Sequence, residues 1–268
     1  MKDSLGMRMK NFYEEIPKTK LMRRTPVAIR IDGKAFHTFT HGFDRPFDEV
    51  LIASMQETMQ YLCEHIQGCV LGYTQSDEIT LILTDYTTFE TAAWFDYEVQ
   101  KLCSISTSMA TMVFNKVFKD NIDFWGWDCF GEEWFEGGTN NIGLTKTKNW
   151  ELCESYFKAL ERGAMFDARC FNIPKEEVTN LIYWRQLDAT RNSIQMVGQA
   201  NFSHKELQGK SCNDIQDMLF LQKGINWNDL PTYMKRGSCC VKTEEGWIID
   251  KNIPIFKGED REYIEKLI

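Results

Sequence analysis

Residues 69–83 read CVLGYTQSDEITLIL, two short apolar runs on either side of a polar connection. Each run has the length and the β-branched or aromatic content of a buried strand. A short polar connection between two such runs is typical of a hairpin. We therefore predict antiparallel strands over 69–73 and 79–83, with Asp77 and Glu78 at the connection between them.

A strand and a helix precede this hairpin, and a second helix and strand follow it. Residues 26–32 form an apolar run that ends in Asp32, and Asp48 opens a helical pattern. The pattern further along the chain predicts a second helix over 91–117 and a strand over 165–171.

The resulting order, β-α-β-β-α-β, is that of the ferredoxin-like split unit. This α+β architecture is also the palm of polymerases and nucleotide cyclases. In it, the end of the first strand lies beside the hairpin of the second and third strands. We therefore expect Asp32 and Asp77 to converge, although 45 residues separate them in the sequence.

The chain divides into two predicted regions. Residues 1–173 form a palm-like catalytic region with an N-terminal helix, and residues 174–268 form a C-terminal part packed on the palm. The C-terminal pattern predicts two helices and a closing hairpin, at 174–202, at 211–221, and at 238–243 with 246–250.

An aromatic-rich segment, residues 119–150, separates the second helix from the last strand of the palm. Its rings occur among Gly and Asn and are Phe124, Trp125, Trp127, Phe130, Trp134 and Phe135. Such rings can stack on nucleic-acid bases. A glycine-rich connection that buries its own aromatics is the commoner arrangement, so a contact between this loop and RNA stays an open question.

Three acids lie at the ends of the predicted strands: Asp32, Asp77 and Glu78. Mg²⁺ prefers hard oxygen ligands, which one or two carboxylates plus substrate phosphates commonly supply. Rigid strands suit a pair of ions that clamps the attacking and leaving oxygens of an in-line displacement. The acids therefore suggest a magnesium site for phosphoryl chemistry, and the alternative is an exposed turn without a ligand.

Composition indicates a soluble globular protein. Of 268 residues, 43% are hydrophobic and 26% are charged, and no run approaches the roughly 18 apolar residues of a membrane span. We expect a cytoplasmic protein, because the first residues lack the apolar stretch of a signal peptide. The nine cysteines include no Cys-x-x-Cys pair, so neither a disulfide framework nor a structural zinc site is predicted.

Four blocks of the sequence resemble the tRNA(His) guanylyltransferase family. They are RIDGKAFH (30–37), GYTQSDE (72–78), WRQLD (184–188) and NDLPTYMKRG (228–237). They occur in the family order, and the resemblance reaches from near residue 3 to near residue 256. It implies a palm-bearing nucleotidyltransferase that binds ATP, GTP and other NTPs, uses two Mg²⁺ ions and acts on tRNA.

The resemblance also implies roles for individual residues. Asp32, Asp77 and the carbonyl of Gly33 would hold the two Mg²⁺ ions, and Glu78 would assist ligation or orient a ligand. The expected nucleotide-binding residues are Gly33, Lys34, Ala35, Phe36, His37, Arg45, Asp48 and Ser76. Arg45 stands where the family usually has lysine, and arginine also binds phosphate oxygens. The expected RNA contacts are Asn192, Lys235 and Arg236.

The net charge of −8 is unusual for a protein that acts on RNA, because phosphate contacts normally call for a basic surface. RNA binding would then rely on local basic patches. Lys235, Arg236 and Lys242 form one such candidate patch.

One stretch departs from the eukaryotic members that add an extra guanosine to tRNA(His). Those members carry HINNLYNT after the Trp-Arg-Gln block, whereas this chain has TRNSIQMV at 190–197 and keeps only Asn192. In this respect the chain is similar to the bacterial, archaeal and phage branch of the family. Members of that branch extend 5′-truncated tRNAs against the opposing template strand.

We therefore expect a template-dependent 3′-to-5′ nucleotidyltransferase that repairs tRNA 5′ ends after ATP activates the 5′-monophosphate. The alternatives are a guanylyltransferase that adds an extra 5′ guanosine to tRNA(His), a palm-type nucleotide cyclase, and a non-catalytic RNA-binding or nucleotide-sensing protein. The clustered acids argue against the last, because a pure binder has little use for them. Family members assemble as tetramers, so a homotetramer is expected.

Overall fold

The computed structural model describes residues 4–130 and 148–268. At its centre lies a six-stranded sheet with the strand order β4-β1-β3-β2-β5-β6. The strands are β1 (Val27–Gly33), β2 (Cys69–Gln75), β3 (Glu78–Leu83), β4 (Phe166–Asn172), β5 (Ser238–Thr243) and β6 (Gly246–Asp250).

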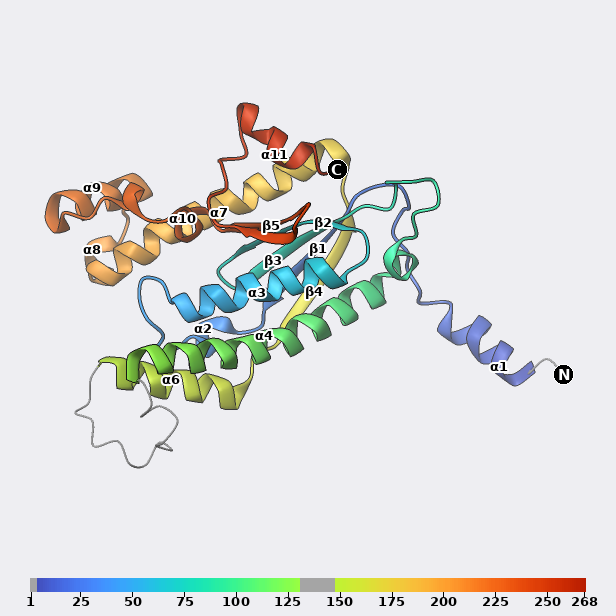
Figure 1. The fold of residues 1–268 in the computed structure, drawn as a ribbon, viewed down its shortest axis with the longest axis horizontal. Coiled ribbons are helices and arrows are strands. Elements are labelled where there is room, and N and C mark those ends of the chain that lie inside the picture. The colour runs from blue at the N-terminus through green and yellow to red at the C-terminus, as the bar shows by residue number, and fades with distance from the viewer. Residues whose placement is uncertain (1–3, 131–147) are drawn as a thin grey trace.

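Helices of very different length surround the sheet. The long ones are α3 (Glu49–His65), α4 (Val99–Phe130), α6 (Lys148–Arg162), α7 (Lys175–Asn201) and α9 (Cys212–Lys223). The short ones are α1 (Ser4–Met9), α2 (Phe36–Phe39), α8 (His204–Leu207), α10 (Thr232–Arg236) and α11 (Glu262–Glu265). In Figure 1, α3 and α4 lie along one side of the sheet and α7 along the other.

The chain order β1, α3, β2, β3, α4, β4 follows the predicted β-α-β-β-α-β order, with α6 added before β4. All neighbouring strands run antiparallel, so the α+β class is confirmed. The predicted C-terminal helices and hairpin are present as α7, α9, β5 and β6. Because β5 pairs with β2, this hairpin extends the same sheet.

Side-chain alternation along β1 separates the two faces of the sheet. Ile29 and Ile31 pack with α3 and α4 in the larger apolar cluster, whereas Ala28 packs in a second cluster with residues of α7. Successive side chains of a strand point to opposite faces. Arg30 and Asp32 therefore lie on the α7 face, where Asp32 is half-buried.

The prediction of a helix over 91–117 is wrong at both ends, because α4 begins at Val99 and ends at Phe130. Phe95, Asp96 and Tyr97 have φ angles of 48°, 51° and 54°. This left-handed backbone is unfavourable for residues with a side chain and cannot continue a right-handed helix. The helix therefore starts only after these residues.

The prediction of an aromatic loop over 119–150 is wrong in its first part. Phe124, Trp125 and Trp127 lie on the last turns of α4. The Trp125 ring packs edge-on against Tyr156 of α6, with centroids 5.2 Å apart, whereas Phe124 and Trp127 are exposed. Phe130 is the last residue of α4, and the other two residues of the prediction, Trp134 and Phe135, lie outside the described residues.

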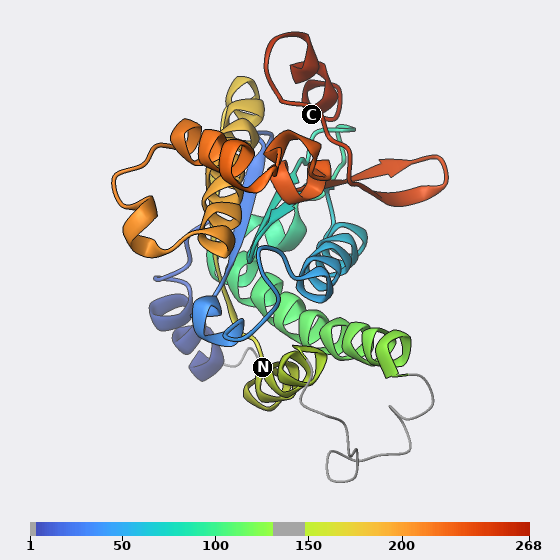
Figure 2. The same ribbon diagram turned by 90° about the vertical axis from the view of Figure 1, so that its left-hand side faces the viewer.

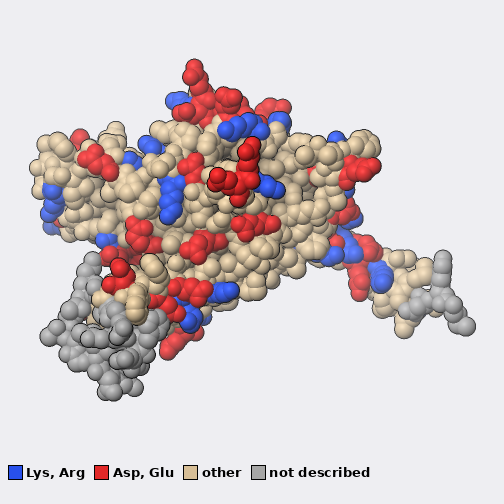
Figure 3. Space-filling model, viewed as in Figure 1, with Lys and Arg blue, Asp and Glu red and all other residues tan. Residues whose placement is uncertain are grey.

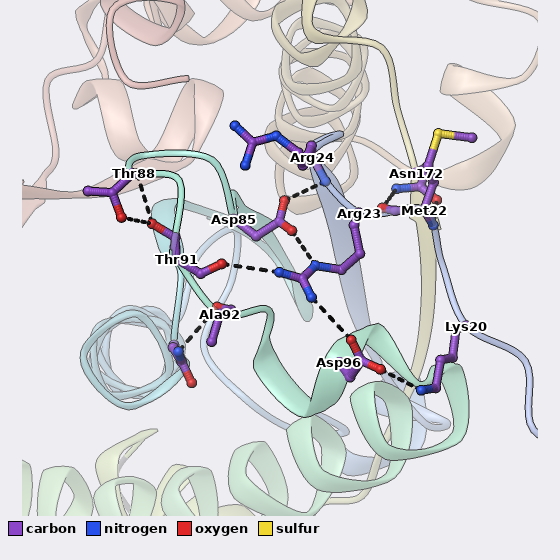
Figure 4. Close-up of polar contacts among 11 residues, drawn as sticks. Lys20, Met22, Arg23, Arg24, Asp85, Thr88, Thr91, Ala92, Asp96 and Asn172 are labelled. Carbon is purple, nitrogen blue, oxygen red and sulfur yellow. Dashed lines mark hydrogen bonds and ion pairs between the residues drawn. The ribbon is translucent and has the colours of Figure 1, made fainter.

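A polar network fixes the segment before β1 to the loop before α4 (Figure 4). The Arg23 guanidinium donates to the carboxylates of Asp85 and Asp96, and the backbone N–H of Arg24 donates to Asp85 at 2.8 Å. Asp85 is fully buried, and these donors satisfy the hydrogen-bonding capacity of its carboxylate oxygens. Beyond this anchor, α1 projects away from the body of the molecule (Figure 1).

The surface carries many carboxylates. Figure 3 shows acidic side chains spread over the face formed by α3 and α4, with basic side chains scattered among them. That distribution agrees with a net charge of −8. Over 4–130 and 148–268, none of the helices is both long and apolar enough to cross a bilayer.

Candidate active site

The turn between β2 and β3 places Asp77 and Glu78 next to the end of β1. The Gly33 N–H donates to the carbonyl of Asp77 at 3.0 Å, and Asp32 lies opposite Glu78 in the β1–β3 register. The tight turn places Ser76 in the left-handed region, with φ 51°. Asp32 and Asp77 are thus brought together, as the predicted strand order requires.

The loop after β1 is fixed by close packing. A β-carbon at Gly33 would lie 2.2 Å from the Phe36 ring, so this close approach requires glycine. Phe36 itself is buried against Phe39 and Phe114. The backbone that follows Asp32 is therefore anchored to the α3–α4 side of the core.

The electrostatics of the turn favour a cation. Burial raises the pKa of Asp77, and the neighbouring charge of Asp32 raises that pKa further, against a hydrogen bond from the Asp77 N–H that lowers it. Two carboxylates close together repel each other, and a bound cation removes that repulsion. Their oxygens and the Gly33 carbonyl are hard ligands of the kind Mg²⁺ prefers, so these residues fit the predicted ion.

Within the described ranges, no group of three or more His, Cys, Asp and Glu side chains is placed to hold a metal ion. The two carboxylates would therefore need further oxygen ligands from the backbone and from a bound phosphate. Mg²⁺ commonly binds in this way, through one or two carboxylates and the substrate.

Glu78 occupies a different environment from Asp32 and Asp77. It is buried, and its Oε1 accepts a hydrogen bond from Arg185 Nε at 2.7 Å. Arg30 Nε lies 3.5 Å from the other carboxylate oxygen. Burial raises the pKa of Glu78, although both arginines act to lower it. The structure therefore gives Glu78 an ion pair that joins β3 to α7, and the ligand role expected for it stays a prediction.

Sequence reasoning did not identify Asp167 of β4. It lies opposite Asp32 in the β1–β4 register, so its side chain shares the α7 face with Asp32 and Glu78. It is exposed and lies 3.5 Å from Arg169. Its position follows from the antiparallel pairing of β4 with β1, which the sequence analysis did not predict.

A cleft of about 650 Å³ lies beside the two carboxylates. Its lining includes most of the residues expected to bind nucleotide, together with one acid of the turn: Gly33, Ala35, Phe36, His37, Arg45, Asp48, Ser76 and Asp77. Lys34 is exposed and does not line it. Met196 and Gln199 of α7 also line the cleft, and their contribution was not predicted.

Asp48 lines this cleft, but its carboxylate is held by the protein. As the N-cap of α3 it accepts from the Leu51 N–H at 2.9 Å, and it also accepts from the Asp44 N–H and the Tyr156 hydroxyl. Burial raises its pKa. These contacts indicate that Asp48 shapes the loop around Arg45, and direct contact with a nucleotide stays a prediction.

The three expected RNA contacts differ in their surroundings. Asn192 lines a small apolar cavity next to the cleft, which shares Ser76 and Met196 with it. Lys235 is buried, and its ammonium donates to the carbonyl of Asn228, which leaves it little access to RNA. Arg236 follows it at the end of α10 and is partly exposed.

Comparison with known proteins agrees with this geometry. The family model described as tRNAHis guanylyltransferase matches residues 6–174 of the chain, which contain Asp32, Asp77 and most of the cleft. The chain belongs to the tRNA(His) guanylyltransferase family. It is therefore a nucleotidyltransferase, as the sequence blocks predicted.

Individual members of the tRNA(His) guanylyltransferase family differ in their similarity to the chain. A bacterial guanylyltransferase-like protein solved in complex with ATP is 41% identical, with a TM-score of 0.80 and 99% of each chain covered. A second such bacterial structure, in complex with GTP, is 37% identical with a TM-score of 0.74 and the same coverage. The Saccharomyces cerevisiae enzyme is 25% identical over 85% of this chain and 86% of its own length. The predicted resemblance to the bacterial branch is thus confirmed.

Proposed function

We propose that this protein extends the 5′ ends of truncated tRNAs in the 3′-to-5′ direction, choosing each NTP by pairing with the template strand. The observation that carries this proposal is the position of residues 190–197. Asn192 and Met196, from this stretch of α7, line the cavities beside Ser76. The sequence departure from the guanosine-adding members therefore lies at the site itself.

The proposed reaction has two steps. An oxygen of the RNA 5′-monophosphate attacks the α-phosphorus of ATP, the bond between the α- and β-phosphates breaks, and pyrophosphate leaves. The 3′-hydroxyl of the incoming NTP then attacks the 5′ phosphorus of the adenylylated RNA, and AMP leaves. The cleft would hold the triphosphate through Ser76, His37 and Arg45, which lie on its walls.

Asp32, Asp77 and the Gly33 carbonyl would hold the two Mg²⁺ ions. When bound, such ions neutralise charge on the attacking and leaving oxygens of an in-line displacement. The Asp77 backbone is held next to the end of β1, because the Gly33 N–H bonds directly to the Asp77 carbonyl. Rigid placement of this kind lowers the cost of assembling the reactants.

One broader feature of the proposal, its palm architecture, is supported by the fold. The strand order β4-β1-β3-β2 within the sheet supports a ferredoxin-like palm. A cytoplasmic location and a homotetramer remain part of the proposal. Exposed apolar side chains on the projecting N-terminal segment, including Met7, Phe12 and Tyr13, are available to a subunit contact, and light scattering coupled to size exclusion measures the assembly.

Arg45→Ala should impair activation selectively. The exposed guanidinium lies on the cleft wall, where it would bind phosphate oxygens of ATP. We expect at least a tenfold lower rate with 5′-monophosphorylated RNA, about 1.4 kcal/mol, and little change with 5′-triphosphorylated RNA, which needs no activation. Single-turnover assays on the two RNAs measure this, and equal losses on both would contradict a role in activation.

The proposed substrate preference is tested by comparing two tRNAs. Pairing with the template should select the nucleotide, so kcat/KM for filling a missing first nucleotide opposite C should exceed that for GTP addition to full-length tRNA(His). Changing the template base should change the added nucleotide accordingly. A tenfold preference for full-length tRNA(His), about 1.4 kcal/mol in the transition state, would favour the guanylyltransferase alternative instead.

The cyclase alternative has a separate signature. A cyclase would convert an NTP to a cyclic monophosphate and pyrophosphate without RNA. Such a product from ATP or GTP alone, at a rate comparable to that of nucleotide addition, would overturn the proposal. A cyclase would leave unexplained the block at 228–237, which contains the buried Lys235 and all of α10.

A further inference from the structure

A second pocket adjoins the nucleotide cleft, between α2 and α6. Its volume is about 200 Å³, and its walls include His37, His41, Ser155, Lys158 and Arg162. His37 and His41 also line the cleft, so the two spaces are neighbours that share a wall. Figures 1 and 2 show α2 close to α6 from two directions.

The walls of this pocket are basic although the protein carries a net charge of −8. Lys158 and Arg162 lie one helical turn apart on α6 and so share a face. Arg162 donates to the Thr38 carbonyl, which holds its guanidinium at the wall. Two histidines from the other side complete the set.

The Glu154 carboxylate contacts these cations only loosely. Lys158 Nζ lies 3.7 Å from Glu154 Oε2, and both side chains are exposed. An exposed pair of this kind contributes little free energy and is easily replaced. The Lys158 ammonium can therefore turn to an anion in the pocket.

We propose that this pocket binds a phosphate oxyanion next to the nucleotide. The Lys158 and Arg162 cations match phosphate oxygens in charge, and the imidazole rings can add hydrogen bonds. Pockets for drug-sized ligands usually exceed about 300 Å³, so this smaller space suits a compact anion. The identity of that anion rests on the proposed function: it is either the pyrophosphate released during activation or a phosphate of the tRNA.

The test compares two double variants that remove equal charge. Lys158→Gln with Arg162→Gln alters the pocket, and Lys175→Gln with Lys257→Gln removes two exposed cations elsewhere. Calorimetry measures the Kd for inorganic pyrophosphate, and fluorescence anisotropy measures the Kd for a 5′-truncated tRNA. We expect the pocket variant to raise the Kd for one of these ligands at least fivefold. The control variant should raise neither Kd by more than twofold.

The two readouts distinguish the sources of the anion. A loss confined to pyrophosphate assigns the pocket to the leaving group, and a loss confined to tRNA assigns it to an RNA phosphate. If the pocket variant binds both pyrophosphate and tRNA as tightly as the wild type, the proposal is overturned. An equal loss of its affinity for ATP also overturns it, because that loss would show general damage to the cleft. Both are binding measurements without turnover, so a failure of the repair reaction would not affect them.

Arg162 also ties α6 to α2, so its replacement can lower stability. If the double variant melts more than about 10 °C below the wild type, which corresponds to a loss of several kcal/mol, Lys158→Gln alone provides the test. The contact of Lys158 with Glu154 is exposed. The Lys158→Gln variant should weaken binding of the same ligand at least twofold. Arg162→Lys should retain binding, and unchanged binding in Lys158→Gln would reject the site.

Discussion

Asp32→Asn and Asp77→Asn should each lower kcat/KM for nucleotide addition by more than 100-fold, about 2.7 kcal/mol of barrier. Each replacement preserves the shape of the side chain but removes a charged oxygen ligand at the turn. Folding should survive, because burial and the neighbouring carboxylate already raise the pKa of Asp77, and a neutral amide relieves that repulsion. Steady-state assays over a Mg²⁺ titration, together with thermal melts, measure both effects.

Asp167→Asn is the matched control for this prediction. Asp167 lies opposite Asp32 on the same face of the sheet, but it belongs to β4 and does not line the cleft. We expect its activity to stay within about threefold of wild type, less than 1 kcal/mol. Activity above a hundredth of wild type in either Asp32→Asn or Asp77→Asn would reject the two-ion assignment.

Arg185→Met should destabilise the folded protein by about 3–5 kcal/mol, because it leaves the buried carboxylate of Glu78 without its closest partner. The Arg185 side chain is only 9% exposed and lies 2.7 Å from Glu78. Arg30, at 3.5 Å, is too distant to replace the lost hydrogen bond. Urea denaturation followed by circular dichroism measures the free energy of unfolding.

Two further variants isolate this ion pair. Arg191→Met makes the same change on the same helix, at an exposed position paired with Asp188. It should lower the free energy of unfolding by less than about 0.5 kcal/mol. Adding Glu78→Gln to Arg185→Met removes the buried charge and should recover much of the lost stability. A double variant no more stable than Arg185→Met would show that Glu78 is not the source of the loss.

The fold was predictable where local patterns agree with tertiary contacts. The apolar runs of β1, β2 and β3 and the start of α3 at Asp48 follow directly from the sequence, because a buried strand and a side-chain N-cap each have a local signature. The start of α4 was not predictable. It depends on the left-handed backbone at Phe95–Tyr97. That segment contains no glycine or proline from which such a backbone could be predicted.

The site was predictable in part for the same reason. The convergence of Asp32 and Asp77 follows from strand order, so sequence reasoning reached it. The burial of Glu78 depends on α7 crossing the sheet and bringing Arg185 to it. Met196 and Gln199 reach the cleft from that same helix. Such contacts join segments more than 100 residues apart and leave no periodic signal in the sequence.

The alternation along β1 also limits how this enzyme can change during evolution. Inserting or deleting one residue within Val27–Gly33 would reverse the two faces, placing Ile31 towards α7 and Asp32 among the apolar side chains of α3 and α4. Both the core and the chemistry would be lost in one event. Length changes are therefore expected in the loop at 40–46, which lines the cleft and lies outside the strand register.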